Sequence, residues 1–126
     1  MDIQLEIYPR ENYIYAIHNY MQLDFQTAVR IMREIALACQ EHQLDKVLID
    51  AQNYIREGST LDFYKFSVFL LEIGLARTKI AVVPDHASMI NEDTEFMETV
   101  ATNRGANFRF FSTQEEARAW LEVDEE

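Results

Sequence analysis

The residues that could carry out chemistry in this sequence follow two expected strands. Asp50 lies near the end of one apolar run, Asp85 and His86 follow the next, and the helix between them starts at Ser59. Because ligands gather beyond the carboxyl ends of strands in open parallel sheets, Ser59, His86 and Asp50 could form a hydrolase triad. Ser59 lacks the glycine-flanked elbow G-x-S-x-G, however, and its hydroxyl is placed to cap a helix. The sequence therefore favours a protein without catalytic residues.

Other kinds of chemical site are disfavoured by residue spacing. Gly58, Gly74 and Gly105 are the only glycines, and they lie too far apart to form a loop that cradles phosphate. The three histidines have no i,i+4 spacing and no neighbouring thiolate, which argues against a metal site. Cys39 is the only cysteine, and its place on an apolar helix stripe predicts a buried, inert thiol. We expect neither a cofactor nor a metal.

Length and charge restrict the partners. A chain of 126 residues, 48% of them hydrophobic, predicts a single domain over 1–126. Its 11 Lys and Arg against 22 Asp and Glu give a net charge of −11, and the basic residues are scattered. This charge argues against nucleic acid and anionic membrane surfaces as partners. The lone cysteine, an acidic start unlike a signal peptide and the absence of a long apolar run predict a cytoplasmic protein without a membrane span.

The order of elements predicts an α/β fold. Alternating or β-rich apolar segments indicate strands at 3–7, 13–18, 46–51, 79–83 and 107–111. Helices are expected after Asp24, Asn91 and two capping boxes, Ser59-Thr60-Leu61-Asp62 and Ser112-Thr113-Gln114-Glu115, with the second helix ending near Gly74. The order β-β-α-β-α-β-α-β-α predicts a mixed, mostly parallel five-stranded sheet with four helices. Asp50 and Arg109 interrupt their strands, which indicates a sheet face that helices cover only in part.

The second expected helix has more apolar surface than a sheet-covering helix needs. Phe69 falls in the polar stripe with Lys65 and Glu72, and Phe66 and Ile73 flank that stripe. A neighbouring helix or loop could bury the excess, or it could form an interaction surface. We expect Phe66, Phe69 and Ile73 to contact a protein partner or a second copy of the chain.

The order of elements and several segments resemble the STAS domains, the anti-sigma-factor-antagonist fold, in a branch of small single-domain bacterial proteins. The segments that carry the resemblance span nearly the whole chain: Val47-Leu48-Ile49-Asp50, Ser59-Thr60, Lys79-Ile80-Ala81-Val82-Val83, Asn103-Arg104-Gly105, Phe110-Phe111, Glu115-Glu116-Ala117 and Trp120-Leu121.

The resemblance implies a βα superhelix and a regulatory protein-binding module that is not an enzyme. In regulatory members, a serine at the start of the second helix is phosphorylated, which releases the partner; Ser59 and Thr60 stand at that place. Here Gly58 and Leu61 replace the acidic residue and the glycine that flank the serine in the family motif. Phosphate at a helix N-terminus would change the charge beside the binding surface. We expect Asp50, Asp85 and His86 to extend this surface beyond the strand ends.

The chain is also similar in outline to lipid-carrying domains of the CRAL-TRIO type. This similarity implies an alternative function, the binding of a small apolar ligand or lipid. The pocket would lie between the second and third helices, beneath the 84–91 loop. Its lining would be Phe63, Phe66, Phe69, Met89, Ile90, Phe96 and Met97.

Overall fold

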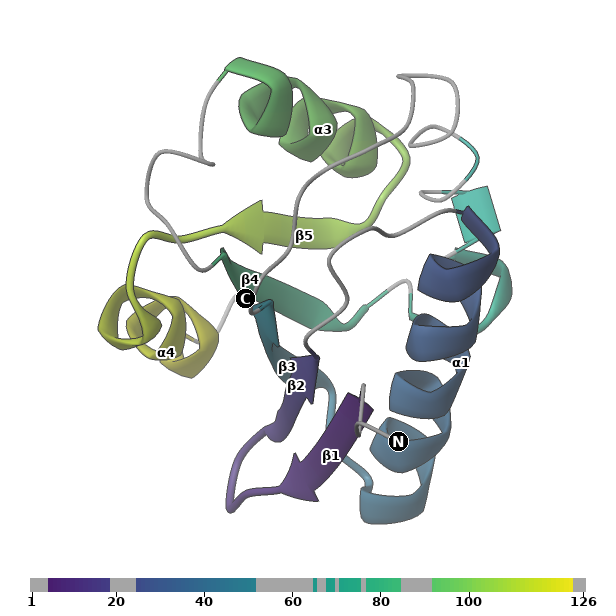
Figure 1. The fold of residues 1–126 in the computed structure, drawn as a ribbon, viewed down its shortest axis with the longest axis vertical. Coiled ribbons are helices and arrows are strands. Elements are labelled where there is room, and N and C mark those ends of the chain that lie inside the picture. Colours follow the sequence, from purple (N-terminus) through teal and green to yellow (C-terminus); the bar gives the residue numbers. More distant parts are fainter. Residues whose placement is uncertain are drawn as a thin grey trace.

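The fold consists of one sheet with helices on both faces (Figure 1). The computed structural model describes residues 5–18, 25–51, 65, 68–69, 71–75, 77–84 and 92–123. These residues form strands β1 (Leu5–Pro9), β2 (Ile14–His18), β3 (Lys46–Ala51), β4 (Lys79–Pro84) and β5 (Asn107–Phe110) and helices α1 (Phe25–His42), α3 (Glu92–Asn103) and α4 (Gln114–Glu122).

The strands follow one another across the sheet in the order β1-β2-β3-β4-β5. β1 pairs with β2 in antiparallel fashion, and the other three pairings are parallel. The predicted α/β fold with a mixed, mostly parallel five-stranded sheet is thereby confirmed.

The described residues contain three helices, where four were predicted. Most of the predicted second helix, like the expected caps Asp24 and Asn91, lies outside the described residues. Within its last part, the Ile73 amide donates to the Phe69 carbonyl at 3.1 Å, which is a helical hydrogen bond. Gly74 follows with φ +90°, a conformation that suits glycine at a helix end.

One face of the sheet carries the larger core. α1 contributes Ile31, Met32 and Ile35, and α3 and the turn after it contribute Ala101 and Ala106. The facing strand residues alternate, as the pleat requires: Ile14 and Ala16, Val47 and Ile49, Ile80 and Val82, and Phe108.

The opposite face carries a smaller core beneath α4. Ala117 and Leu121 of α4 pack on Leu48, Ala81 and Val83, at the centre of the sheet. Figure 1 shows α1 and α4 on opposite sides of the sheet, with β1 and β2 extending beyond α4. Tyr15 of β2 packs against this smaller core, and Tyr8 of the edge strand β1 is exposed.

A buried lysine fastens α4 to the sheet. The Lys79 ammonium group donates to the Trp120 carbonyl at 3.0 Å and also to the Val123 carbonyl. It lies 5.1 Å from the centre of the Trp120 ring. Because carbonyl groups at a helix C-terminus lack helical partners and carry partial negative charge, this ammonium group stabilises that end of α4.

The residues that begin and end the helices differ from the prediction at α4 and include one unusual backbone conformation after α1. Thr113, not Ser112, caps α4: its hydroxyl oxygen accepts from the Glu116 amide at 3.1 Å, one position later than the predicted capping box. Gly105 after α3 has φ +87°, as its predicted role as a helix stop requires. After α1 the same left-handed conformation is adopted by Gln43, with φ 56°.

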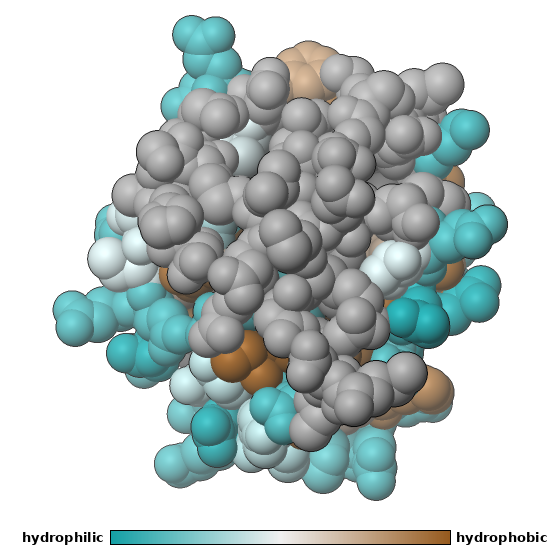
Figure 2. All heavy atoms as spheres, viewed as in Figure 1, coloured by the Kyte–Doolittle hydropathy of each residue, from teal (hydrophilic) through white to brown (hydrophobic). Residues whose placement is uncertain are grey.

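The described side chains on the face shown in Figure 2 are mostly hydrophilic, and the hydrophobic ones form small, separate areas.

Candidate functional site

Asp50 is held by two neutral donors at the carboxyl end of β3. The Tyr15 hydroxyl donates to its carboxylate at 2.8 Å, and the Gln114 side-chain amide donates to the same oxygen at 3.0 Å. Burial and then the hydrogen bond to Asp50 raise the pKa of Tyr15. The Asp50 carboxylate thus links β2, β3 and the start of α4.

His18 lies at the same edge of the sheet but on the opposite face. It pairs in register with Ala51, next to Asp50, and is only 4% exposed. Burial lowers the pKa of His18 from 6.5 to about 4, although the charge of Asp50 acts in the opposite direction. The imidazole is therefore neutral near pH 7. Its burial was not predicted, although the alternation of Ile14, Ala16 and His18 along β2 was a sequence signal for it.

The other residues predicted at this edge, Ser59, Thr60, Asp85 and His86, lie outside the described residues. Of the hydrolase triad, only Asp50 is placed. Within the described residues, the hydrogen-bond partners of Asp50 are the Tyr15 hydroxyl and the Gln114 side-chain amide.

The predicted docking residues are placed only in part. Phe69 is 9% exposed and packs in the larger core, and the Arg33 guanidinium lies 5.4 Å from its ring centre. The expectation that Phe69 is on the surface is therefore wrong, because α1 covers it. Ile73 is half-buried against the same core, and Phe66 lies outside the described residues. A docking role for the segment stays a prediction.

An aromatic cluster lies on the α4 face at the β1–β2 end of the sheet. Tyr15 packs against the core beneath α4, and Tyr8 stands opposite it on the edge strand β1. The rings of Tyr8 and Tyr15 stack with centres 6.4 Å apart and planes at 27°. The Arg10 guanidinium lies 5.6 Å from the first ring centre and 5.3 Å from the second. Tyr8 is 40% exposed, and Ile17, two residues after Tyr15 on the same face of β2, is half-buried. We call Tyr8, Arg10, Tyr15 and Ile17 the open half-face.

The open half-face was not predicted from the sequence, although the predicted hairpin contained the signal. Tyr8 and Tyr15 stand directly opposite each other in the β1–β2 register. Cross-strand neighbours share one face, so correct pairing of the two arms would have brought these rings together.

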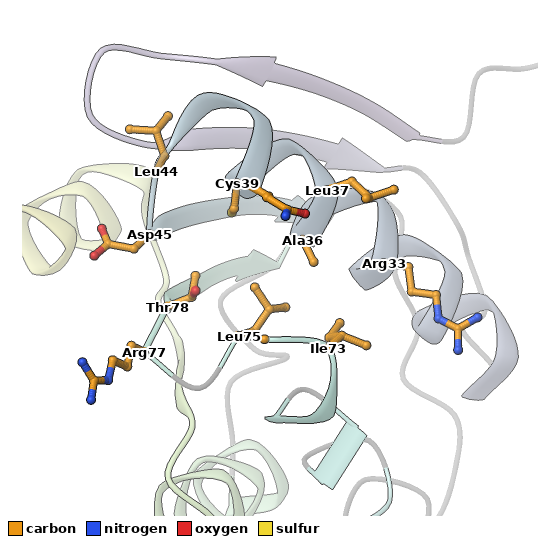
Figure 3. A pocket seen from close by; sticks show the side chains of 12 residues that line it. Arg33, Ala36, Leu37, Cys39, Leu44, Asp45, Ile73, Leu75, Arg77 and Thr78 are labelled. Carbon is orange, nitrogen blue, oxygen red and sulfur yellow. The ribbon is translucent and has the colours of Figure 1, made fainter.

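A groove with a volume of about 620 Å³ runs between α1 and the segment that leads into β4 (Figure 3). We call it the α1 groove. Its lining consists of Arg33, Ala36, Leu37, Cys39, Gln40, Leu44, Asp45, Ile73, Gly74, Leu75, Arg77 and Thr78. Cys39 is buried as predicted, and burial raises the pKa of its thiol to about 11, so the thiolate is scarce near pH 7.

The α1 groove differs from the predicted apolar pocket. Of the residues expected to line that pocket, Phe69 and Met97 are buried and Phe96 is 50% exposed. The other four lie outside the described residues.

Two further observations concern metals and membranes. The described residues contain no group of three or more His, Cys, Asp or Glu side chains that could hold a metal ion. Among these residues, none of the helices has the length and apolar character needed to cross a bilayer.

Comparison with known proteins does not identify a family. No protein-family model matches this chain, and no curated protein matches it either. The fold therefore establishes a small α/β domain with a mixed five-stranded sheet.

Proposed function

We propose that this protein is a non-catalytic, regulatory protein-interaction module of the STAS type that docks through the open half-face. The supporting observation is the uneven cover of the sheet. α1 and α3 pack on one face, whereas α4 packs mainly on β3 and β4 of the other. Tyr15 of β2 packs against the core beneath α4, and Tyr8 and Arg10, on the far side of Tyr15, stay exposed.

The composition of the open half-face favours a protein partner. Tyr and Arg are enriched among the residues that dominate binding energy at protein interfaces. Tyr8, Arg10 and Tyr15 already contact one another, so little side-chain freedom is lost when a partner covers them. The nearby Asp50 carboxylate has its position fixed by Tyr15 and Gln114, which gives the surface a defined acidic border.

The open half-face replaces Phe69 in the proposal, since the Phe69 side chain is buried. Ser59 and Thr60 keep their proposed role as a phosphorylation switch. This role is supported by the resemblance to anti-sigma-factor antagonists and by the charge that a phosphate would add. Phosphate on either residue after incubation with cell extract and ATP, detected by mass spectrometry, would support the switch; its repeated absence would contradict it.

The docking surface is tested with Arg10→Glu and Tyr8→Ala, both at exposed positions. Arg104→Glu is the matched control, because Arg104 is exposed after α3 and its substitution changes the net charge equally. Each variant serves as bait in affinity purification from the source cells, after circular dichroism has verified its fold. Light scattering measures self-association.

We expect one protein, or a second copy of the chain, to bind the wild type and the control. Loss of a central Tyr or Arg contact costs about 2 kcal/mol, or roughly thirtyfold in Kd. The proposal would be contradicted if all variants recovered every partner as well as the wild type does. It would also be contradicted if the wild type were a monomer that retained no partner.

A further inference from the structure

The α1 groove has a buried apolar floor and an α1 wall on which exposed Leu37 stands between the polar residues Arg33 and Gln40. Leu75 is 2% exposed and Cys39 is 7% exposed, so they form the floor. Leu37 is 64% exposed and stands on the α1 wall, and Ile73 lies across the groove from it (Figure 3). A leucine with this much exposed surface beside a groove gains from contact with an apolar ligand, because that contact removes its surface from water.

The two ends of the groove differ in charge. Arg33 stands at one end, and Arg77 stands at the other together with Asp45 (Figure 3). The Asp45 carboxylate offsets the positive charge at its own end, whereas the lining residues include no acid near Arg33. In a protein of net charge −11, the Arg33 end is thus the part of this groove that favours an anion.

The setting of Arg33 suits it to bind a carboxylate. Its guanidinium lies 5.4 Å from the centre of the Phe69 ring, which holds the side chain in place from one side. A cation–π contact of this kind leaves the N–H groups of a guanidinium able to form paired hydrogen bonds to a carboxylate.

We propose that the α1 groove binds a medium-length acyl chain that ends in a carboxylate. The chain lies along Leu37, Ile73 and Leu75, and the carboxylate binds Arg33. From Arg33 to Gln40 the α1 wall runs for about 10 Å, which limits the chain to medium length. The groove opens on the α1 side of the sheet, so this proposal is independent of docking through the open half-face.

The test is calorimetric titration with decanoate, with decanol and decyltrimethylammonium as probes of the same chain length. Variants Arg33→Gln and Leu37→Asn are compared with Arg77→Gln, the matched control at the other end of the groove. Methyl NMR spectra then locate the ligand. Shifts are expected at Leu37, Ile73 and Leu75, and Leu121 on the opposite face should not move.

We expect decanoate to bind with a Kd below about 1 mM and both other probes to bind more weakly. Arg33→Gln should weaken decanoate binding about tenfold, whereas Arg77→Gln should change it less than about threefold. Leu37→Asn should weaken decanoate and decanol alike. The proposal is overturned by absent saturation, by equal effects of the two arginine variants, by equal binding of the cationic probe, or by methyl shifts outside the groove.

Discussion

The burial of His18 predicts a loss of stability in mild acid. Its pKa is about 4 in the folded protein, against 6.5 for a histidine exposed to water, so the unfolded chain binds more protons between these values. The contribution of neutral, buried His18 to the free energy of unfolding is therefore fully present above pH 6.5, and it falls as the pH drops towards 4. One pKa unit corresponds to about 1.36 kcal/mol, so about 2 kcal/mol is lost between pH 7 and pH 5, and about 3 kcal/mol in total.

The assay is urea unfolding at pH 7 and pH 5, followed by the fluorescence of Trp120, the only tryptophan. Carboxylates also titrate towards acid pH, so the quantity of interest is the difference between wild type and His18→Gln. Between pH 7 and pH 5, the free energy of unfolding of this variant should fall by about 2 kcal/mol less than that of the wild type. His42→Gln, at the exposed end of α1, is the control and should behave as wild type. Equal losses in wild type and His18→Gln would refute the argument from burial.

Three further predictions concern single residues. Lys79→Met removes the donor to the Trp120 carbonyl and should lower the free energy of unfolding by about 2 kcal/mol in urea titrations. Glu98 accepts from the Phe110 amide at 2.7 Å, so Glu98→Ala should speed hydrogen exchange of that amide about tenfold, as measured by NMR. Gln43 has φ 56°, so Gln43→Gly should raise the free energy of unfolding by roughly 0.5–1 kcal/mol; a decrease would contradict the strain argument.

The strands were predictable because their burial is a local pattern. Residues 79–84 form an almost continuous apolar run, and β4 is buried along its whole length. The helix stop at Gly105 was equally local, since a glycine is suited to a positive φ. Cys39 lies on the apolar stripe of α1, and its burial follows from that periodicity.

The candidate sites were harder to predict because they depend on contacts between distant segments. Phe69 is next to polar positions in its own helical repeat, and its burial comes from packing in the larger core, to which α1 contributes. The α1 groove likewise combines α1 with residues 73–78, and no spacing within either segment indicates it. The open half-face depends on the hairpin register, which places Tyr8 opposite Tyr15.

Each edge of the sheet has one feature that disfavours the addition of a strand. At β5, the Glu98 side chain occupies the Phe110 amide that faces outward. At β1, the Arg10 amide points inward to the Tyr13 carbonyl at 2.8 Å, so the preceding Pro9 stands at an outward position and has no N–H to offer. Each edge thus lacks one donor that a partner strand would use, although Ile7 and Leu5 also stand at outward positions of β1. A partner that binds at β1 and β2 is therefore expected to cover the side chains of the open half-face.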